Sequence, residues 1–289
     1  MKSIRAFLLA LSLAVPSFAF ADDGPRIVVA GGDLTEIVFA LGRGDDVVGV
    51  DTTSGWPLEA TTREQVGYMR RLSAEGVLSL TPDLLLVAPD AGPKSVLELI
   101  EKAGVEIATA PGDDGADGVA DKIAFVSTAL GATEAGEAAK KDYQLRLDGA
   151  REIASGDATG QRVLFVLSIR DGAPIVGGAD TSANEMIREA GAVNAAADID
   201  GYKPMNAEAI IAAAPDVILM TNAHADRLGG LDDVLDRPDI SLTPAGRERR
   251  AVLMDALLLL GMGPRTPEAI VELSRGLSAK RDNDASEDG

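Results

Sequence analysis

Short apolar runs alternate with helical patterns in the first half of the chain. Four runs rich in Val, Ile and Leu are predicted to be buried strands: residues 26–32, 46–51, 84–90 and 105–109. Between them, residues 33–42 and 93–103 place apolar side chains at helical spacing, and Asp33 is expected to cap the first of these helices. Strands that alternate with helices of about ten residues predict a parallel sheet covered by helices.

The alternation of strands and helices stops after residue 116 and resumes after residue 155. Residues 117–155 are rich in Ala, Glu, Lys and Arg, which favours a long helical stretch, with an interruption near Gly131. After it we predict strands at 162–168 and 217–220 and helices at 181–190, 206–213 and 247–260. The sequence therefore predicts an α/β protein with two Rossmann-like lobes, each with a parallel sheet, joined by a long α-helix.

An internal repeat supports two lobes of one plan. The segment 73–87, SAEGVLSLTPDLLLV, aligns without gaps with 206–220, NAEAIIAAAPDVILM. In both copies a polar cap begins a short helix, and its second residue is a glutamate, Glu75 or Glu208, where the helix dipole favours a carboxylate. A duplicated lobe plan accounts for the shared register. The alternative is that any capped helix before a strand has this pattern.

The N-terminal segment has the features of a signal peptide. Residues 1–21 contain Lys2 and Arg5, a short apolar run and a small-residue cleavage site, so we expect them to be removed on export. The remaining chain is expected to comprise four parts: an N-terminal lobe (22–130), a linker helix (131–156), a C-terminal lobe (157–279) and a disordered tail (280–289). Because there is no cysteine, neither a disulfide nor a lipidated N-terminal cysteine is possible. We expect a soluble periplasmic protein.

Charge and missing motifs exclude several function classes. The formal net charge of −19 disfavours nucleic acids and anionic membranes as partners. The chain lacks the G-x-G-x-x-G and P-loop motifs of nucleotide sites and the G-x-S-x-G of serine hydrolases. One histidine and no cysteine make a catalytic zinc site, or a manganese or zinc carrier, improbable. We therefore do not expect an enzyme.

Four segments resemble the haem-binding periplasmic proteins of bacterial haem ABC importers, which are helix-linked (class III) substrate-binding proteins. They are RIVVAGGDLTEIVFALGRGDDVVGVDTTS (26–54), VGYMRRLSAEGVLSLTPDLLLV (66–87), GYKPMNAEAIIAAAPDVILM (201–220) and LTPAGRERRAVLMDALLLLGMGPRTPEA (242–269). The resemblance implies a ligand cleft between the lobes and a rigid linker helix. It also implies a monomer that receives ferric haem (protoporphyrin IX) from an outer-membrane receptor and passes it to an inner-membrane permease and its ATPase. A carrier of a ferric siderophore or a corrinoid is the alternative.

By this resemblance, Tyr68 is the axial ligand of the haem iron and Arg70 its hydrogen-bonded partner. A phenolate is a known axial ligand of haem, and a nearby cation favours the charged form of a tyrosine. If the segment is extended, side chains at i and i+2 share a face, which would place Arg70 beside Tyr68. The alternative is a half-buried loop tyrosine beside solvated arginines.

The remaining candidates divide between haem contact and transporter docking. We expect Arg71 and Arg227 to face the haem propionates, with Met69, Arg170 and His224 as further candidate contacts; for Tyr202 a structural role is expected. Arg170 lies where some relatives have a histidine, so a second haem with a histidine ligand is doubtful. The resemblance also implies that one carboxylate in each lobe, Glu75 and Glu208, docks onto arginines of the permease.

Overall fold

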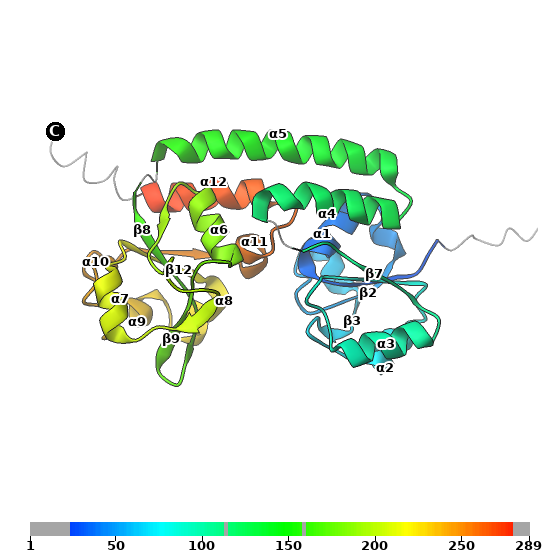
Figure 1. Ribbon diagram of the computed structural model, residues 1–289, viewed down its shortest axis with the longest axis horizontal. Coiled ribbons are helices and arrows are strands. Elements are labelled where there is room, and N and C mark those ends of the chain that lie inside the picture. Colours follow the sequence, from blue (N-terminus) through cyan, green and yellow to red (C-terminus); the bar gives the residue numbers. More distant parts are fainter. Residues whose placement is uncertain (1–23, 113–114, 158–159, 280–289) are drawn as a thin grey trace, which may run out of the picture.

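Two α/β lobes lie side by side beneath one long helix in the computed structural model, which describes residues 24–112, 115–157 and 160–279 (Figure 1). The expected signal peptide (1–21) and C-terminal tail (280–289) lie outside the described residues.

The first lobe contains a five-stranded sheet in the order β3-β2-β1-β6-β7, and every neighbouring pair is parallel. Its strands are β1 (Ile27–Ala30), β2 (Val47–Val50), β3 (Glu64–Gln65), β6 (Leu84–Val87) and β7 (Glu106–Thr109). The central strands β1 and β6 are completely buried, which explains why their residues are all apolar. The helices of this lobe are α1 (Gly32–Ala40), α2 (Ala74–Leu78), α3 (Lys94–Lys102) and α4 (Gly115–Ala129), with 3-10 turns η1 (Gly44–Asp46) and η2 (Leu58–Thr62). A separate hairpin pairs β4 (Gly67–Tyr68) with β5 (Arg71–Leu72).

The second lobe contains a mixed sheet in the order β11-β9-β8-β12-β13, with β10 also paired to β8. Strands β8, β10, β12 and β13 are parallel, whereas β9 and β11 run antiparallel to their neighbours β8 and β9. The strands are β8 (Arg162–Arg170), β9 (Ala173–Gly177), β10 (Val193–Asn194), β11 (Tyr202–Pro204), β12 (Val217–Thr221) and β13 (Ala251–Met254). The helices are α6 (Ser182–Glu189), α7 (Ala207–Ala213), α8 (Asn222–Arg227), α9 (Leu231–Leu235), α10 (Pro244–Arg247), α11 (Ala256–Leu260) and α12 (Thr266–Ser278). The two-lobed α/β fold was predicted; the antiparallel strands were not.

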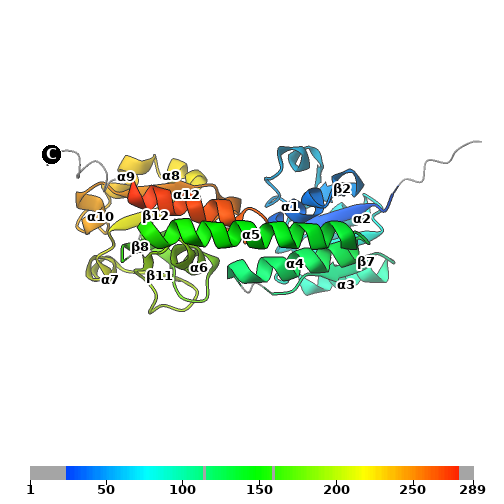
Figure 2. The same cartoon turned by 90° about the horizontal axis from the view of Figure 1, so that it is seen from above.

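The long helix α5 (Thr133–Asp157) runs along both lobes and packs against α4 of the first lobe and α12 of the second (Figure 2). The buried Tyr143 donates a 2.6 Å hydrogen bond to the carbonyl of Ala116 at the start of α4. Arg151 binds carboxylates on both sides, Asp117 of α4 and Glu189 of α6. Polar contacts therefore anchor α5 to each lobe and limit how freely the lobes can move about it.

Two local predictions were wrong. Residues 247–260 do not form one helix; they contain the end of α10, strand β13 and helix α11. Their Ala, Leu and Met residues favour helix, but pairing with β12 places 251–254 at the edge of the sheet. Helix α1 begins at Gly32 and has Gly31 at its cap position, so Asp33 lies in the first turn and its carboxylate pairs with Lys122.

In the part of the chain that the structure describes, no helix combines the length and apolar character needed to cross a membrane.

Candidate functional site

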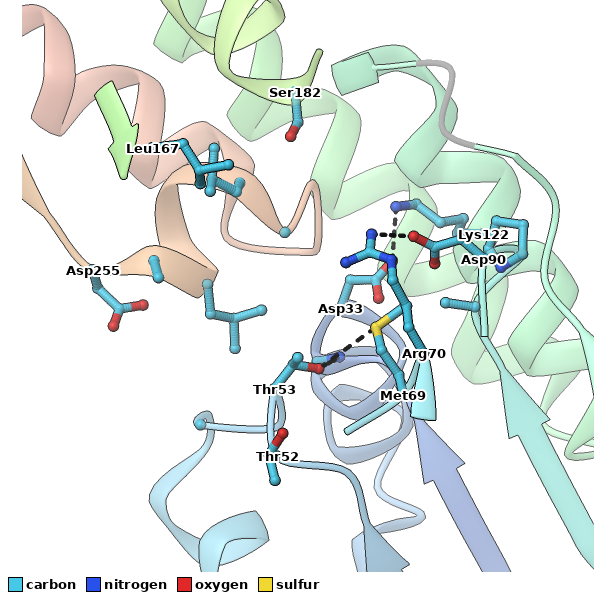
Figure 3. A pocket seen from close by; sticks show the side chains of 18 of the residues that line it. Asp33, Thr52, Thr53, Met69, Arg70, Asp90, Lys122, Leu167, Ser182 and Asp255 are labelled. Atoms are coloured by element: carbon cyan, nitrogen blue, oxygen red, sulfur yellow. Dashed lines mark hydrogen bonds and ion pairs between the residues drawn. The ribbon is translucent and has the colours of Figure 1, made fainter. Parts of the chain in front are cut away.

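A cleft of about 880 Å³ lies between the two lobes (Figure 3). In the first lobe its walls are loops that follow the carboxyl ends of β1, β2, β6 and β7, where parallel α/β sheets present their ligand sites. The lining residues of the first lobe are Gly32, Asp33, Thr52, Thr53, Gly55, Met69, Arg70, Ala88, Pro89, Asp90, Pro111 and Lys122. Those of the second lobe are Leu167, Ser182, Tyr202, Asp255, Ala256, Leu257, Leu260 and Gly261.

Tyr68 lies in a tight hairpin whose turn, formed by Met69 and Arg70, lines the cleft; Tyr68 itself is not among the lining residues. Strands β4 and β5 place Tyr68 opposite Arg71, and Met69 and Arg70 form the two-residue turn between them. Arg70 Nη1 donates a hydrogen bond to the Tyr68 hydroxyl, with the guanidinium carbon 5.8 Å from the ring centroid. The predicted contact is therefore present, but the expected extended segment was wrong, because the chain turns and Arg70 reaches Tyr68 from the turn.

Arg70 is shared between a phenol and a carboxylate. Its Nη2 donates to Asp90 Oδ2, and both Arg70 and Asp90 line the cleft (Figure 3). Burial alone would lower the pKa of Arg70, but the hydrogen bonds to Tyr68 and Asp90 and the Asp90 charge raise it above the usual arginine value. The guanidinium therefore stays charged beside the Tyr68 oxygen at any physiological pH.

Asp51, which sequence reasoning missed, fixes the loops around this hairpin. The carboxylate is completely buried and accepts hydrogen bonds from three backbone N–H groups: Gly31 (3.0 Å), Thr53 (3.0 Å) and Met69 (3.1 Å). The hydroxyls of Thr53 and Ser54 also donate to it. A single side chain thus joins the start of α1, the loop after β2 and the Met69–Arg70 turn. The signal in the sequence was an aspartate directly after a buried strand, followed by three hydroxyl residues.

The second lobe presents a mostly apolar wall. Leu167 of β8, Tyr202 of β11, and Ala256, Leu257 and Leu260 of α11 face the cleft. Tyr202 has its expected structural contact, an edge-to-face packing on Phe165 at 6.4 Å between ring centroids, but it also lines the cleft. The leucines of α11 were not predicted as site residues.

Five predicted haem residues are not among the described residues that line the cleft: Tyr68, which contacts the lining residue Arg70, and Arg71, Arg170, His224 and Arg227. His224 Nε2 accepts a 3.1 Å hydrogen bond from the Ile169 N–H, which connects α8 to β8. Burial lowers the pKa of His224, and the nearby Arg227 charge lowers it further. Its imidazole is therefore neutral and has its acceptor nitrogen engaged by the backbone. Arg227 is exposed and donates from Nε to the Ala223 carbonyl within its own helix.

A hydrogen bond from Lys122 and an ion pair of Arg265 connect the two lobes. Lys122 of α4 binds Asp33 Oδ2 at 2.8 Å and the carbonyl of Met262, in the second lobe, at 2.6 Å. Arg265, at the start of α12, binds Glu36 of α1. Burial raises the pKa of Glu36 although Arg265 opposes the shift. The Lys122–Met262 hydrogen bond and the Arg265–Glu36 ion pair therefore hold the two lobes together.

The two lobes are also closely packed at Gly32. A Cβ at this position would lie 2.5 Å from the Thr53 carbonyl oxygen and 2.6 Å from Leu257 Cδ1. Only glycine therefore allows α1 to begin this close to α11 of the other lobe.

The duplicated glutamates are exposed in both lobes. Glu75 lies in the first turn of α2, which is capped by a 3.3 Å hydrogen bond from the Gly76 N–H to Ser73 Oγ. Glu208 lies in the first turn of α7, which is capped by a 2.8 Å hydrogen bond from the Ala209 N–H to Asn206 Oδ1. Both predicted caps are confirmed, and neither carboxylate has an ion-pair partner among the described residues.

Comparisons with known proteins agree on one family. Residues 27–257 match the family model described as "Periplasmic binding protein". The solved structure of the periplasmic heme-binding protein RhuT from Roseiflexus sp. RS-1, in its apo form, is 40% identical, with a TM-score of 0.85, and covers 89% of this chain and 98% of that one.

Two curated relatives extend the comparison. The uncharacterized ABC transporter substrate-binding lipoprotein YvrC of Bacillus subtilis is 31% identical over 246 residues, which are 84% of this chain and 76% of YvrC. The vitamin B12-binding protein of Vibrio cholerae is 27% identical over 201 residues, which are 69% of this chain and 71% of that protein.

Proposed function

The chain belongs to the periplasmic binding protein family, and we propose that it binds ferric haem between its lobes and delivers it to an inner-membrane ABC importer. The observation that carries this proposal is the Tyr68 phenol, which is hydrogen-bonded to the charged Arg70, a residue that lines the interlobe cleft. The similarity to a periplasmic heme-binding protein over almost the whole of both chains supports it.

Tyr68 would ligate the iron, and Arg70 would stabilise the ligated form. Ferric porphyrin has a positively charged centre that a phenolate neutralises, and tyrosine is a known axial haem ligand. A cation that donates a hydrogen bond to the oxygen favours the deprotonated ligand. Met69 follows Tyr68 in the same turn and lines the cleft, where its thioether can pack on the porphyrin.

The apolar wall of the second lobe supports a flat, largely hydrophobic cargo. Leu167, Leu257 and Leu260 offer no hydrogen-bond partner from their side chains, whereas a porphyrin face needs none. The cleft volume of about 880 Å³ lies within the usual range of roughly 300–1,000 Å³ for ligand pockets. Burial of the porphyrin against this wall would supply most of the binding free energy, and Tyr68 would fix the orientation.

The transport partners would be an ABC permease and its ATPase, as the substrate-binding role of the relative YvrC indicates. We propose that Glu75 and Glu208 dock onto the permease, one from each lobe, because both are exposed and occupy equivalent positions of the repeat. The chain would act in the periplasm as a monomeric carrier that receives haem from an outer-membrane receptor.

Titration of the purified protein with ferric haem tests the ligand assignment. We expect a saturable high-spin ferric spectrum for the wild type, and loss of that spectrum with weaker binding for Tyr68→Phe, which keeps the ring and removes the oxygen. Tyr202→Phe is the matched control, because it removes the hydroxyl of the tyrosine that lines the cleft from the second lobe. An unchanged spectrum and affinity for Tyr68→Phe would show that Tyr68 is not the ligand.

A corrinoid is the second candidate cargo, because a curated relative is a vitamin B12-binding protein. A carrier of this class needs polar partners for the amide groups around the corrin ring, and the apolar wall of α11 provides few. Titration with cyanocobalamin under the same conditions separates the two: tight binding of cobalamin and none of haem would replace the haem proposal.

A further inference from the structure

We propose that Asp90 is a positioning residue of the haem site: it holds the Arg70 guanidinium against the Tyr68 hydroxyl before haem arrives. This inference rests on the proposed function. Its basis is a row of three groups, in which Asp90 Oδ2 accepts from one terminal nitrogen of Arg70 and the other terminal nitrogen donates to Tyr68 Oη.

The backbone fixes Asp90 relative to Tyr68. The Gly92 N–H donates to the Met69 carbonyl at 2.9 Å, and the Leu72 N–H donates to the Gly92 carbonyl at 2.8 Å. The loop after β6, which carries Asp90, is therefore joined by two backbone hydrogen bonds to the hairpin that carries Tyr68. The main chain therefore holds the backbone of Asp90 near that of Tyr68, and the Arg70 side chain joins their polar ends.

Exposure argues against a purely structural role for this ion pair. The side chains of Arg70 and Asp90 are 55% and 48% exposed, and pairs at that exposure contribute only about 0–1 kcal/mol to stability. The Lys122–Asp33 pair, with side chains 4% and 15% exposed, is the structural one in the same cleft. What Asp90 changes is the freedom of Arg70, whose long side chain otherwise samples many rotamers.

The chemical consequence concerns the bond between Tyr68 and iron. A hydrogen bond from Arg70 to the phenolate oxygen stabilises the charged form of the iron ligand, and Asp90 orients that donor. Partners of this kind, one step removed from the metal ligand, typically change metal affinity by about 10–100-fold. We therefore expect Asp90 to affect haem binding only through Arg70.

A double-mutant cycle measures this dependence. The rate of ferric-haem release to excess apomyoglobin is compared for the wild type, Arg70→Ala, Asp90→Ala and the double variant. We expect Asp90→Ala to accelerate release by about 10-fold, Arg70→Ala to do so by at least as much, and the double variant to match Arg70→Ala. The ferric absorption bands should shift in the same direction in both single variants, which a change in folding alone would not produce.

Asp45→Ala is the matched control. Asp45 is also an aspartate of the first lobe facing an arginine, Arg63 at 3.9 Å, but its side chain is fully exposed and does not line the cleft. It should release haem at the wild-type rate. Asp90→Asn keeps an acceptor oxygen for Arg70 and should lie between the wild type and Asp90→Ala. If Asp90→Ala does not fold by circular dichroism, the same cycle is run with Asp90→Asn.

Two results would overturn the inference. One is an Asp90 variant that releases haem at the wild-type rate with an unshifted spectrum. The other is an equal acceleration by the Asp90 substitution in the wild-type and Arg70→Ala backgrounds, which would show that Asp90 acts independently of Arg70. A wild-type protein that binds no ferric haem would instead refute the proposed function.

Discussion

Replacement of Asp51 by asparagine should destabilise the first lobe and loosen the haem site together. The Asp51 carboxylate is buried and accepts from three backbone N–H groups, of which Gly31 binds Oδ1 and Thr53 and Met69 bind Oδ2. An asparagine side chain has a single acceptor oxygen, so its NH2 group must face at least one of these donors.

The loss of unfolding free energy is worked out for the amide orientation that gives up the fewest backbone hydrogen bonds. With the amide oxygen in place of Oδ2, the Gly31 N–H loses a hydrogen bond to a charged acceptor, worth about 1.5–3 kcal/mol. The Thr53 and Ser54 hydroxyls, which also donate to Oδ1, must turn so that they accept from the amide NH2 group. The backbone N–H bonds of Thr53 and Met69 are retained but lose their charge assistance. The sum is roughly 3 kcal/mol, which is large beside a typical stability of about 5–15 kcal/mol but leaves the protein folded.

Urea unfolding followed by circular dichroism measures this loss, with Asp45→Asn as the matched surface control. A freed Met69 turn should also weaken ferric-haem binding, because Tyr68 and Arg70 lose their fixed support. Surface substitutions usually change the free energy of unfolding by no more than about 0.5 kcal/mol. If the unfolding free energies of Asp51→Asn and Asp45→Asn differ by less than that, the Asp51 carboxylate does not organise these loops.

Two further predictions concern the surface and the second lobe. Glu75→Ala combined with Glu208→Ala should leave haem binding intact and stop haem uptake in vesicles containing the importer; unimpaired uptake would remove the docking proposal. Because the pKa of His224 is lowered in the folded chain, its stabilising contribution is present above about pH 6.5 and is lost as the pH falls. His224→Ala should therefore lose less unfolding free energy than the wild type between pH 7.5 and pH 5.5, with an unchanged haem spectrum; a shifted spectrum would restore His224 as a ligand candidate.

Local patterns predicted most elements because the signals that set them are local. The Ser73 and Asn206 caps, the interruption of the long helix at Gly131 and the fully apolar strands β1 and β6 depend on neighbours within a few residues. The segment 251–254 was misassigned because Ala, Val, Leu and Met fit a helix or a buried strand equally well. Only pairing with β12, more than thirty residues earlier in the chain, selects the strand.

In the candidate site, too, contacts between neighbours in sequence differ from contacts between distant segments. The sequence by itself determined the two-lobed plan and placed Tyr68 and Arg70 two positions apart, whereas the hairpin that brings them into contact was seen only in the structure. Only the tertiary structure brought Asp51 beneath the Met69 turn, Asp90 onto Arg70, and the leucines of α11 across the cleft. The physical reason is that these contacts join chain segments far apart in sequence, and the backbone hydrogen bonds and lobe packing that align them exist only in the folded chain.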